Sequence, residues 1–381
     1  MKTRTSNPAP RAAFALIMVM ITIIALTALV ASFALSMSTE VRLARNADYD
    51  LELEWMGRSG IELARFALAN KCPEQRGIDA LNQFWAGGAA PCSNDMPQIS
   101  LKDVPLGLGH FSVTITDMER KWDINLVANP RAPQLEVLQK ALTEVGVTDA
   151  GLSSTISDSI RDWCSPNTTA LFSGAKDDYY KRLNPPYYCK NGTIDDLTEL
   201  LLIKGVTPEI YWGSNSTNHP ISAYQQHGGG AFDRPTSTSG GHFRNNDEPV
   251  YPVGLQELFS PMGGPLNINT ASIKTLQLIP GIDEGAAAEI IRRRAGPDGI
   301  DGTEDDAPFL SPGEINGMNV TGAPQPGNPT QNLANYIGVR SYVFEVRVDA
   351  EINGYKRSFY GVVSRGGAGA QQFKCVKFYW E

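Results

Sequence analysis

The longest feature of the hydropathy pattern is an uninterrupted apolar run near the amino terminus. Residues 14–37, FALIMVMITIIALTALVASFALSM, contain no charge, proline or glycine. At about 1.5 Å per residue, a helix of this length crosses a hydrocarbon core about 30 Å thick. The run therefore predicts a transmembrane segment.

The pattern becomes amphipathic after Met37. Apolar residues recur at intervals of three and four among charged ones, and no proline occurs between Pro10 and Pro73. This spacing is typical of a helix with one buried face. We expect a single helix over residues 14–70, half in lipid and half in water.

Three later stretches alternate apolar and polar residues with the period of a half-buried strand, at 110–118, 342–352 and 355–363. The last two flank Asn353 and Gly354, and Asn-Gly between alternating runs is a strong hairpin signal. We expect one small antiparallel sheet packed on the amphipathic half of the helix, with the residues between the first and second strands inserted into it.

The insertion reads as mainly helical, with helices predicted at 133–144 and ending at 158–163. It contains an internal repeat, because residues 196–207 align with 272–283 at a constant offset and match at Gly205 and Gly281. Each copy predicts a helix, a glycine turn and a second helix, at 208–212 and 284–294. The Gly/Ser/Asn/His-rich stretch 214–246 between the copies predicts a mobile loop.

The residues before the apolar run carry only positive charges, at Lys2, Arg4 and Arg11. By the positive-inside rule this end stays in the cytoplasm and the rest is exported. The small residues Ala12 and Ala13 precede the apolar run, whereas a Sec-type cleavage site follows one. An ordinary signal anchor is the alternative interpretation.

This start resembles the prepilin signal of pilins and pseudopilins, which a prepilin peptidase cuts on the cytoplasmic side. The resemblance implies cleavage between Ala13 and Phe14, with Ala13 in place of the usual glycine. Most pilins carry glutamate at the fifth mature position, which is Met18 here. With this departure, the motifs SGAKDDYYKRLNPPY (173–187) and LNINTASIKTLQLIPGI (266–282) and the closing strands, the chain is similar to the GspK-type minor pseudopilins of type II secretion.

The resemblance implies an α+β fold in which a long transmembrane and amphipathic helix packs on a small antiparallel, pilin-like sheet. A large, mainly α-helical domain with two helix-hairpin-helix or SAM-like repeats is inserted into that sheet. The expected organisation is a leader (1–13), the transmembrane part (14–37), the first part of the pilin-like domain (38–122), the inserted α-domain (123–335) and the closing strands (336–381).

The implied function is structural and not enzymatic. A GspK-type subunit caps the tip of the pseudopilus, helps to initiate its assembly and supports export of folded proteins across the outer membrane. The implied partners are the minor pseudopilins I and J, the major pseudopilin, the prepilin peptidase and the inner-membrane secretion platform. The implied location is the bacterial inner membrane, with a single span, the amino terminus in the cytoplasm and the domains in the periplasm.

Two rival functions compete with this interpretation. Residues 267–294 resemble a helix-hairpin-helix unit, whose turn offers backbone amides to a DNA phosphate, as in a membrane-anchored competence-type protein. Asp283 and Glu284 stand where that phosphate would lie, and a net charge of −8 argues against nucleic acid as a partner. A membrane-tethered enzyme is the second rival, but the sequence has no HExxH, GxSxG, Walker or GxGxxG context.

The stretch 296–306 is rich in oxygen ligands. Closely spaced carboxylates repel one another unless something neutralises them, and calcium prefers six to eight oxygen ligands. We expect a calcium site here, as the resemblance also implies, with a solvated acidic turn as the alternative. The candidate ligands are Asp298, Asp301, Glu304, Asp305 and Asp306.

The five cysteines suit disulfides in a periplasmic domain, because neither close pair shows the CxxC spacing of a metal site. Cys72 with Cys92 and Cys164 with Cys189 are the candidate pairs. Cys375 is left without a predicted partner.

Overall fold

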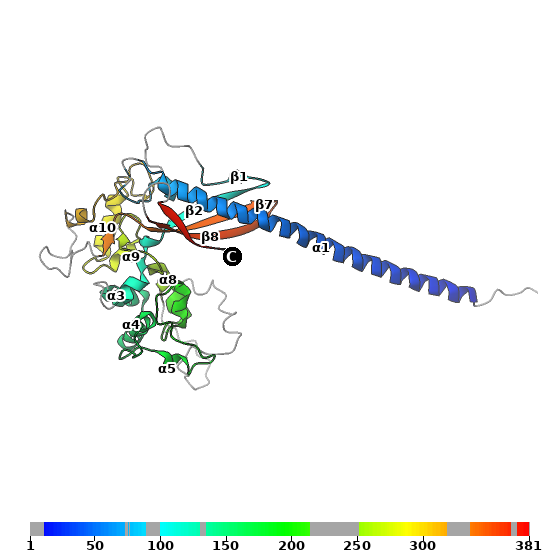
Figure 1. Ribbon diagram of the computed structural model, residues 1–381, viewed down its shortest axis with the longest axis horizontal. Coiled ribbons are helices and arrows are strands. Elements are labelled where there is room, and N and C mark those ends of the chain that lie inside the picture. The colour runs from blue at the N-terminus through cyan, green and yellow to red at the C-terminus, as the bar shows by residue number, and fades with distance from the viewer. Residues whose placement is uncertain are drawn as a thin grey trace, which may run out of the picture.

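The computed structural model describes residues 11–72, 75, 77–88, 100–129, 135–213, 251–317, 336–366 and 372–380. Its most prominent element is α1 (Arg11–Ala69), a helix of 59 residues that projects far from the remainder of the molecule (Figure 1). The prediction of one continuous helix is confirmed. Every described side chain from Phe14 to Asp48 is exposed, and Tyr49 is hydrogen-bonded to Asn353 in the turn that follows β7.

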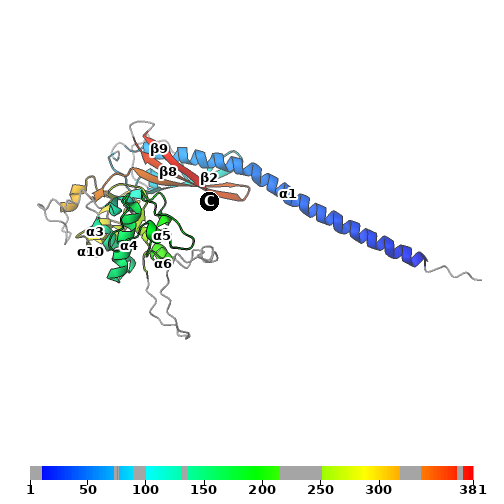
Figure 2. The ribbon, with the colours of Figure 1, turned by 60° about the horizontal axis from the view of Figure 1, so that its bottom comes forward.

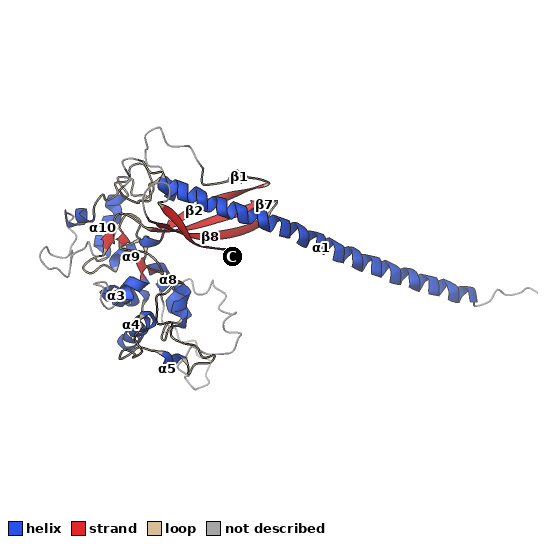
Figure 3. Cartoon of the chain, viewed as in Figure 1, coloured by secondary structure: helices blue, strands red, loops and turns tan. Residues whose placement is uncertain are grey.

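The second half of α1 lies on a five-stranded antiparallel sheet with strand order β1-β2-β7-β8-β9 (Figures 1 and 3). The predicted strands at 110–118, 342–352 and 355–363 correspond to three of these, and Asn353 and Gly354 have the positive φ angles, 49° and 82°, of a tight hairpin turn. The two edge strands, β1 and β9, were not predicted. The bounds are β1 Val104–Leu106, β2 Gly109–Asp117, β7 Val343–Ile352, β8 Tyr355–Arg365 and β9 Phe373–Trp380.

The alternating pattern explains how the sheet packs. Val113 lies opposite Val348 and Ile115 opposite Val346, and all four side chains are buried. Two glycines on α1 allow the helix to approach this face closely. A β-carbon at Gly57 would lie 2.5 Å from the ring of Phe359, so only glycine fits there without displacement.

Residues between β2 and β7 form the inserted region, which lies beside the end of the sheet farthest from the exposed part of α1 (Figure 2). Its own hydrophobic core is separate from the core between α1 and the sheet. The longer helices are amphipathic, as Leu138 and Leu142 show by their burial in this core. The helices are α2 Ile124–Ala128, α3 Leu135–Val145, α4 Ala150–Cys164, α5 Asp177–Tyr180, α6 Pro208–Trp212, α8 Leu255–Leu258, α9 Ile273–Gln277 and α10 Glu284–Arg294.

Short segments complete this region. Two two-residue parallel pairings join distant parts of the chain: β3 with β4, and β5 with β6. The remaining elements of the described residues are 3-10 helices, of which η2 precedes the sheet. The bounds are β3 Trp122–Asp123, β4 Phe259–Ser260, β5 Leu266–Asn267, β6 Ile337–Gly338, η2 Phe84–Ala86, η3 Met118–Arg120, η4 Leu197–Leu202 and η6 Pro312–Gly317.

The internal repeat has similar local geometry in both copies. Gly205 and Gly281 adopt positive φ angles of 89° and 83°, and each is followed by a helix, α6 or α10. The helix predicted before the first glycine is present as the 3-10 helix η4, which an Asp196–Glu199 capping box begins. The predicted mobile loop 214–246 lies outside the described residues.

Candidate functional site

The exposed part of α1 is the first candidate site. One described helix is long and apolar enough to cross a membrane, with a mean hydropathy of 2.8 in its most apolar window. Phe14 is exposed, and so is Met18, whose thioether cannot supply the carboxylate that most pilins carry at this position. Ala13 lies inside α1, and cleavage at the Ala13–Phe14 bond remains a prediction.

The acidic loop follows directly on α10. Arg294 is 5% exposed, and its guanidinium donates to both carboxylate oxygens of Asp301, at 2.9 and 2.7 Å. The same guanidinium also donates to the backbone carbonyls of Ile268 and Ala271. Asp301 is therefore the counter-ion of a buried arginine, which removes it from the set of carboxylates available to a cation.

The other carboxylates of the loop hold its backbone turns. The hydroxyl of Thr303 lies 2.8 Å from Oδ1 of Asp305 and 3.1 Å from Oδ1 of Asp306, while Asp298 accepts from the amide of Ile300. Hydrogen bonding from Thr303 lowers the pKa of Asp305. The hydroxyl of Thr303 thus lies next to two carboxylate oxygens, which makes three oxygens in all, fewer than calcium requires.

The structure does not bring the five candidate carboxylates together at one point. Glu304 is exposed, and among the residues that the structure describes no three His, Cys, Asp or Glu side chains come close enough together to hold a metal ion. The acidic loop fits a cation only if backbone carbonyls or water supply the remaining ligands.

The helix-hairpin-helix candidate presents no basic surface. Asp283 caps α10 by accepting from the amide of Ala286, at the place where a phosphate would bind. The arginines at the other end of α10 all have acidic partners. Arg292 pairs with Glu289, Arg293 with Glu314 and Arg294 with Asp301. This neutralisation is unfavourable for DNA binding, which depends on cations that are available to phosphates.

The cysteines differ from the prediction in one pair. Cys72 is disulfide-bonded, and Cys92, its predicted partner, lies outside the described residues. Cys164 and Cys189 are free thiols, so the bond predicted between them is not formed in the structure. The thiol of Cys164 donates to the side-chain amide oxygen of Asn125 at 3.9 Å, and the thiol of Cys189 donates to the backbone carbonyl of Asp162 at 3.8 Å. Burial raises the pKa of Cys164 to about 12, which keeps the thiol protonated.

A buried polar network joins the two cores where the insertion begins and ends. Asp79 has no exposed surface; it forms ion pairs with Lys71 and with Arg365 on β8, and accepts from the amide of Ser341. Although burial acts to raise the pKa of Asp79, the two cations lower it below its ordinary value. Sequence reasoning missed this cluster, because its members lie up to 286 positions apart.

A second carboxylate extends this network into the insertion. Asp117, at the end of β2, accepts from the hydroxyls of Ser341 and Thr270 and from the amide nitrogen of Asn267. Asn267 also donates to the backbone carbonyl of Asp79 and to Ser341. Burial raises the pKa of Asp117. These bonds link the end of one sheet strand to the insertion and to the segment that leads into β7.

Glu119 lies next to this network and is 1% exposed. Its Oε2 accepts from the amide of Tyr342 at 3.1 Å, and its Oε1 has no hydrogen-bond partner among the described residues. Burial and the neighbouring charge of Asp117 raise the pKa of Glu119 to about 8. The side chain is therefore largely protonated at neutral pH.

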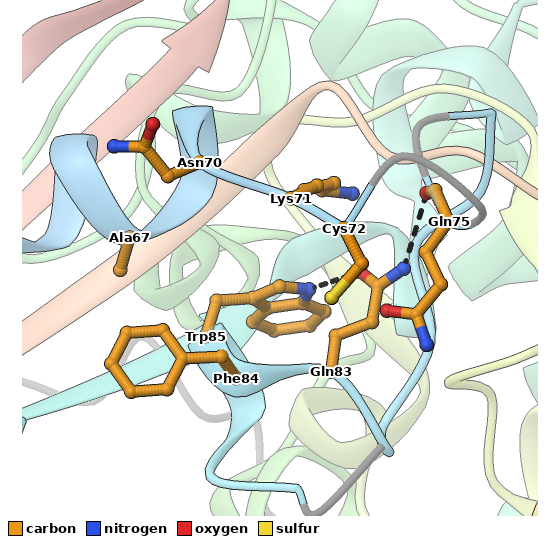
Figure 4. Close-up of a pocket in the computed structure, with 8 residues that line it drawn as sticks. All are labelled: Ala67, Asn70, Lys71, Cys72, Gln75, Gln83, Phe84 and Trp85. Carbon is orange, nitrogen blue, oxygen red and sulfur yellow. Dashed lines mark hydrogen bonds between the residues drawn. The ribbon is translucent and has the colours of Figure 1, made fainter. Parts of the chain in front are cut away.

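A small hollow lies at the end of α1 (Figure 4). Trp85 donates from its indole nitrogen to Gln83, whose own amide donates to the backbone carbonyls of Gln75 and Ile78. The space of about 10 Å³ holds roughly one water molecule, so it does not fit an organic substrate. Its lining consists of Ala67, Asn70, Lys71, Cys72, Gln75, Gln83, Phe84 and Trp85.

Comparison with known proteins agrees with these features. A family model described as "Type II secretion system (T2SS), protein K" matches residues 121–213. The putative type II secretion system protein K of Escherichia coli K12 is 26% identical over 209 residues, which cover 52% of this chain and 58% of that protein. The type II secretion system protein K of Aeromonas hydrophila is 24% identical over 202 residues, covering 52% and 60%. The chain thus matches somewhat less than two thirds of the length of each relative.

A solved structure supports the same assignment at the level of the fold. A chain in the crystal structure of the GspK-GspI-GspJ complex from enterotoxigenic Escherichia coli is similar with a TM-score of 0.59 and 17% identity. The match covers 89% of this chain and 99% of that one. Residues 121–213 thus match the model of the type II secretion system protein K (GspK) family, whose members are structural and not enzymatic, and the chain is similar to GspK proteins in sequence over about half of its length and in fold over most of it.

Proposed function

We propose that this chain is the minor pseudopilin that caps the tip of a type II secretion pseudopilus, where it helps to initiate assembly and supports export of folded proteins across the outer membrane. One observation supports the proposal most directly. The exposed apolar half of α1 leads to a sheet and a large insertion at the other end of the molecule (Figure 1). A head of this size fits at the end of a filament more readily than inside one.

In this proposal the apolar part of α1 crosses the inner membrane in a defined direction. The basic residues before the apolar run hold the amino terminus in the cytoplasm, and the sheet and insertion lie in the periplasm. A prepilin peptidase removes residues 1–13. Amino-terminal sequencing of protein extracted from membranes should yield Phe14 as the first residue. A retained leader, or loss of the whole apolar run, would contradict the proposal.

The proposed partners are the minor pseudopilins I and J, the major pseudopilin and the inner-membrane secretion platform. The similar crystal structure is that of a complex of GspK with GspI and GspJ, which supports the first two. Gold labelling of this chain on pseudopili that overproduce the major pseudopilin should mark one filament end. Label distributed along the filaments would rule out a capping position.

Calcium is a further part of the proposal. Thr303, Asp305 and Asp306 would hold the ion together with backbone carbonyls of the loop, and the ion would neutralise the acidic turn. Titration of the full chain with calcium should raise its thermal unfolding temperature, because an ion that binds only the folded state stabilises it. The double variant Asp305→Asn/Asp306→Asn should lose this rise, whereas Glu304→Gln, which alters an exposed side chain of the same loop, should keep it.

A further inference from the structure

Glu119 lies at the joint between the sheet and the insertion. It belongs to η3, which follows β2 where the chain leaves the sheet, and its Oε2 accepts from the amide of Tyr342, where the chain returns to β7. Gly264, in the loop between β4 and β5, lies beside the same carboxyl group, because a β-carbon at this position would be 3.2 Å from Oε1. The carboxyl group of Glu119 therefore lies between both crossings of the chain and a loop of the insertion.

Two cations of the joint are already paired with another carboxylate. Arg365 donates from both terminal nitrogens to Asp79, at 2.8 and 3.0 Å, and Lys71 forms an ion pair with the same group. In the described part of the chain, Glu119 accepts one hydrogen bond, from Tyr342, and its Oε1 has no partner. A buried carboxylate with a single donor is costly, so this carboxyl group keeps its proton while the joint is closed.

Charged groups face Glu119 from each neighbouring element. Gly263 separates it from Asp123, since a β-carbon at Gly263 would lie 3.2 Å from Cγ of Glu119 and 3.8 Å from Cβ of Asp123. Arg340 directs its guanidinium toward the ring of Tyr342, 5.9 Å from the ring centre. The charged groups around Glu119 are Asp79 after α1, Asp117 on β2, Arg120 on η3, Lys121 after η3, Asp123 on β3, Arg340 before β7 and Arg365 on β8.

The neighbouring carboxylate of Asp117 connects β2 to the insertion. It accepts from the hydroxyl of Thr270 and from the side-chain amide of Asn267. A negative charge on Glu119 would repel Asp117 within this buried network. Farther from the joint, Lys377 on β9 and Asp196 on the insertion lie 4.0 Å apart, and both side chains are about half exposed, so this pair adds little stability. The buried joint therefore decides how firmly the insertion is held.

We propose that Glu119 acts as a proton-dependent switch between the sheet and the insertion. The protonated carboxyl group keeps the insertion in its place beside the end of the sheet (Figure 2). Loss of the proton to water leaves an uncompensated charge in the joint, and the insertion moves away about its two chain crossings until the carboxylate is hydrated. The sheet and α1 keep their fold, because their core is separate from that of the insertion. This switch does not depend on the proposed function.

The expected pH dependence follows from the two states of the joint. Burial raises the pKa of Glu119 to about 8 in the closed state, from about 4.5 ordinarily. The ratio of released to closed molecules should therefore rise with pH between these values and level off above pH 8. Glu119 alone should raise this ratio about fiftyfold between pH 6 and pH 8.

The other buried groups of the joint affect this range less or act in the same direction. Burial raises the pKa of Asp123 to about 6, so its effect falls mainly below pH 6. Burial lowers the pKa of Lys71 to about 8, so its opposing effect falls mainly above pH 8. Burial also raises the pKa of Asp117, which adds to the effect of Glu119. A variant of Glu119 is needed to separate these two carboxyl groups.

A distance between spin labels measures the position of the insertion. Cys375 is an exposed thiol on β9, and Ser154 is exposed on α4, so Ser154→Cys places a second label on the insertion. Pulsed electron paramagnetic resonance on the full chain in detergent should give one distance at pH 6. At pH 8 a second, broader distance should account for at least about a tenth of the molecules. The chain without Ser154→Cys, labelled in the same way, corrects for any label on Cys164 or Cys189.

Two variants identify the group that titrates. Glu119→Gln keeps the shape of the side chain but stays neutral, so it should show the single distance at both pH values. Glu136→Gln is the matched control, because it removes the charge of an exposed glutamate on α3. This control should develop the second distance at pH 8 as the native chain does.

Three results would overturn the switch. The first is a native chain whose distance distribution is the same at pH 6 and pH 8. The second is a Glu119→Gln variant that develops the second distance as the native chain does, because another group would then control the joint. The third is loss of the near-ultraviolet circular dichroism of the aromatic side chains over the same pH range, because the second distance would then report unfolding of the whole chain.

Discussion

Asp79 shows how single residues couple the two cores. Its carboxylate compensates two buried cations, Lys71 and Arg365, which come from the segment after α1 and from β8. Burial is also the main reason why the pKa of Lys71 falls to about 8. Removal of a partner from a buried ion pair is far more costly than loss of an exposed one, because the remaining charge stays desolvated.

Asp79→Ala should therefore lower the free energy of unfolding by about 3–5 kcal/mol. Asp195→Ala is the matched control, because Asp195 pairs with Lys190 but its side chain is 72% exposed, and its loss should cost less than about 1 kcal/mol. Urea unfolding of the full chain in detergent, followed by tryptophan fluorescence, measures both. Equal effects of the two substitutions would show that the buried network adds no stability.

Glu119 makes stability depend on pH at the same junction. Its pKa is about 8 in the folded chain and about 4.5 ordinarily, so the folded state holds the proton more tightly. This contribution is complete below pH 4.5 and is lost as pH rises through 8. Asp117, whose pKa burial also raises, acts in the same direction, whereas Asp79, with a lowered pKa, loses its contribution only in acid.

Glu119→Gln should remove part of this dependence, because the amide stays neutral at every pH. We expect the variant to be more stable than the native chain at pH 8.5, by about 1–2 kcal/mol, and to differ least near pH 5. Thermal unfolding between pH 5 and pH 8.5 measures the difference. A variant that follows the native curve throughout would contradict a protonated Glu119.

At the scale of elements, the sequence predicted what local periodicity determines. The apolar run and its amphipathic continuation predicted α1, and alternation around Asn353 and Gly354 predicted β7 and β8. The strand β9 was missed because its alternation is broken where Val376 bulges out of register opposite Val362 and Val363. A bulge shifts which residues face the core, so a strict period of two does not detect such a strand.

The acidic loop shows that composition alone does not predict which partner each carboxylate has. Five carboxylates close together in sequence predicted a bound cation. The sequence did not show that one of these carboxylates instead pairs with a buried arginine. Arg294, buried after its helix folds against Ile268 and Ala271, takes Asp301 as its partner. Neither contact follows from residue spacing. The buried network around Asp79 escaped prediction for the same reason.

The contact between α1 and the sheet depends on its glycines. A β-carbon at Gly60 would lie 2.5 Å from Cγ1 of Val348. Gly60→Ala should therefore destabilise the chain by about 1–3 kcal/mol, although alanine favours helix. Gly285→Ala, in the exposed first turn of α10 with its nearest neighbour at 3.5 Å, should stabilise slightly. Urea unfolding tests both, and a stabilising effect at Gly60 would mean that the helix can move away without cost.

At the scale of the whole molecule, α1 also sets the distance between the body and the membrane. No described side chain between Met37 and Tyr49 is buried, and the first hydrogen bond to the sheet joins Tyr49 to Asn353. Tyr49 lies twelve positions beyond Met37, which corresponds to about 18 Å along the helix. Because no described residue packs on this stretch, its length affects how far the sheet and insertion stand from the membrane and not how they fold.

Deletion of residues 38–44 tests this separation. Loss of seven residues shortens the helix by about 10 Å and turns the body by only about 20°, so the face it presents is nearly preserved. In vesicles, energy transfer from a dye on Cys375 to acceptor lipids should increase, while the thermal unfolding temperature stays unchanged. Replacement of the same residues by seven alanines keeps the length and should leave the transfer at the native value. Equal transfer in the deletion and the native chain would mean that α1 does not stand as a straight shaft between lipid and body.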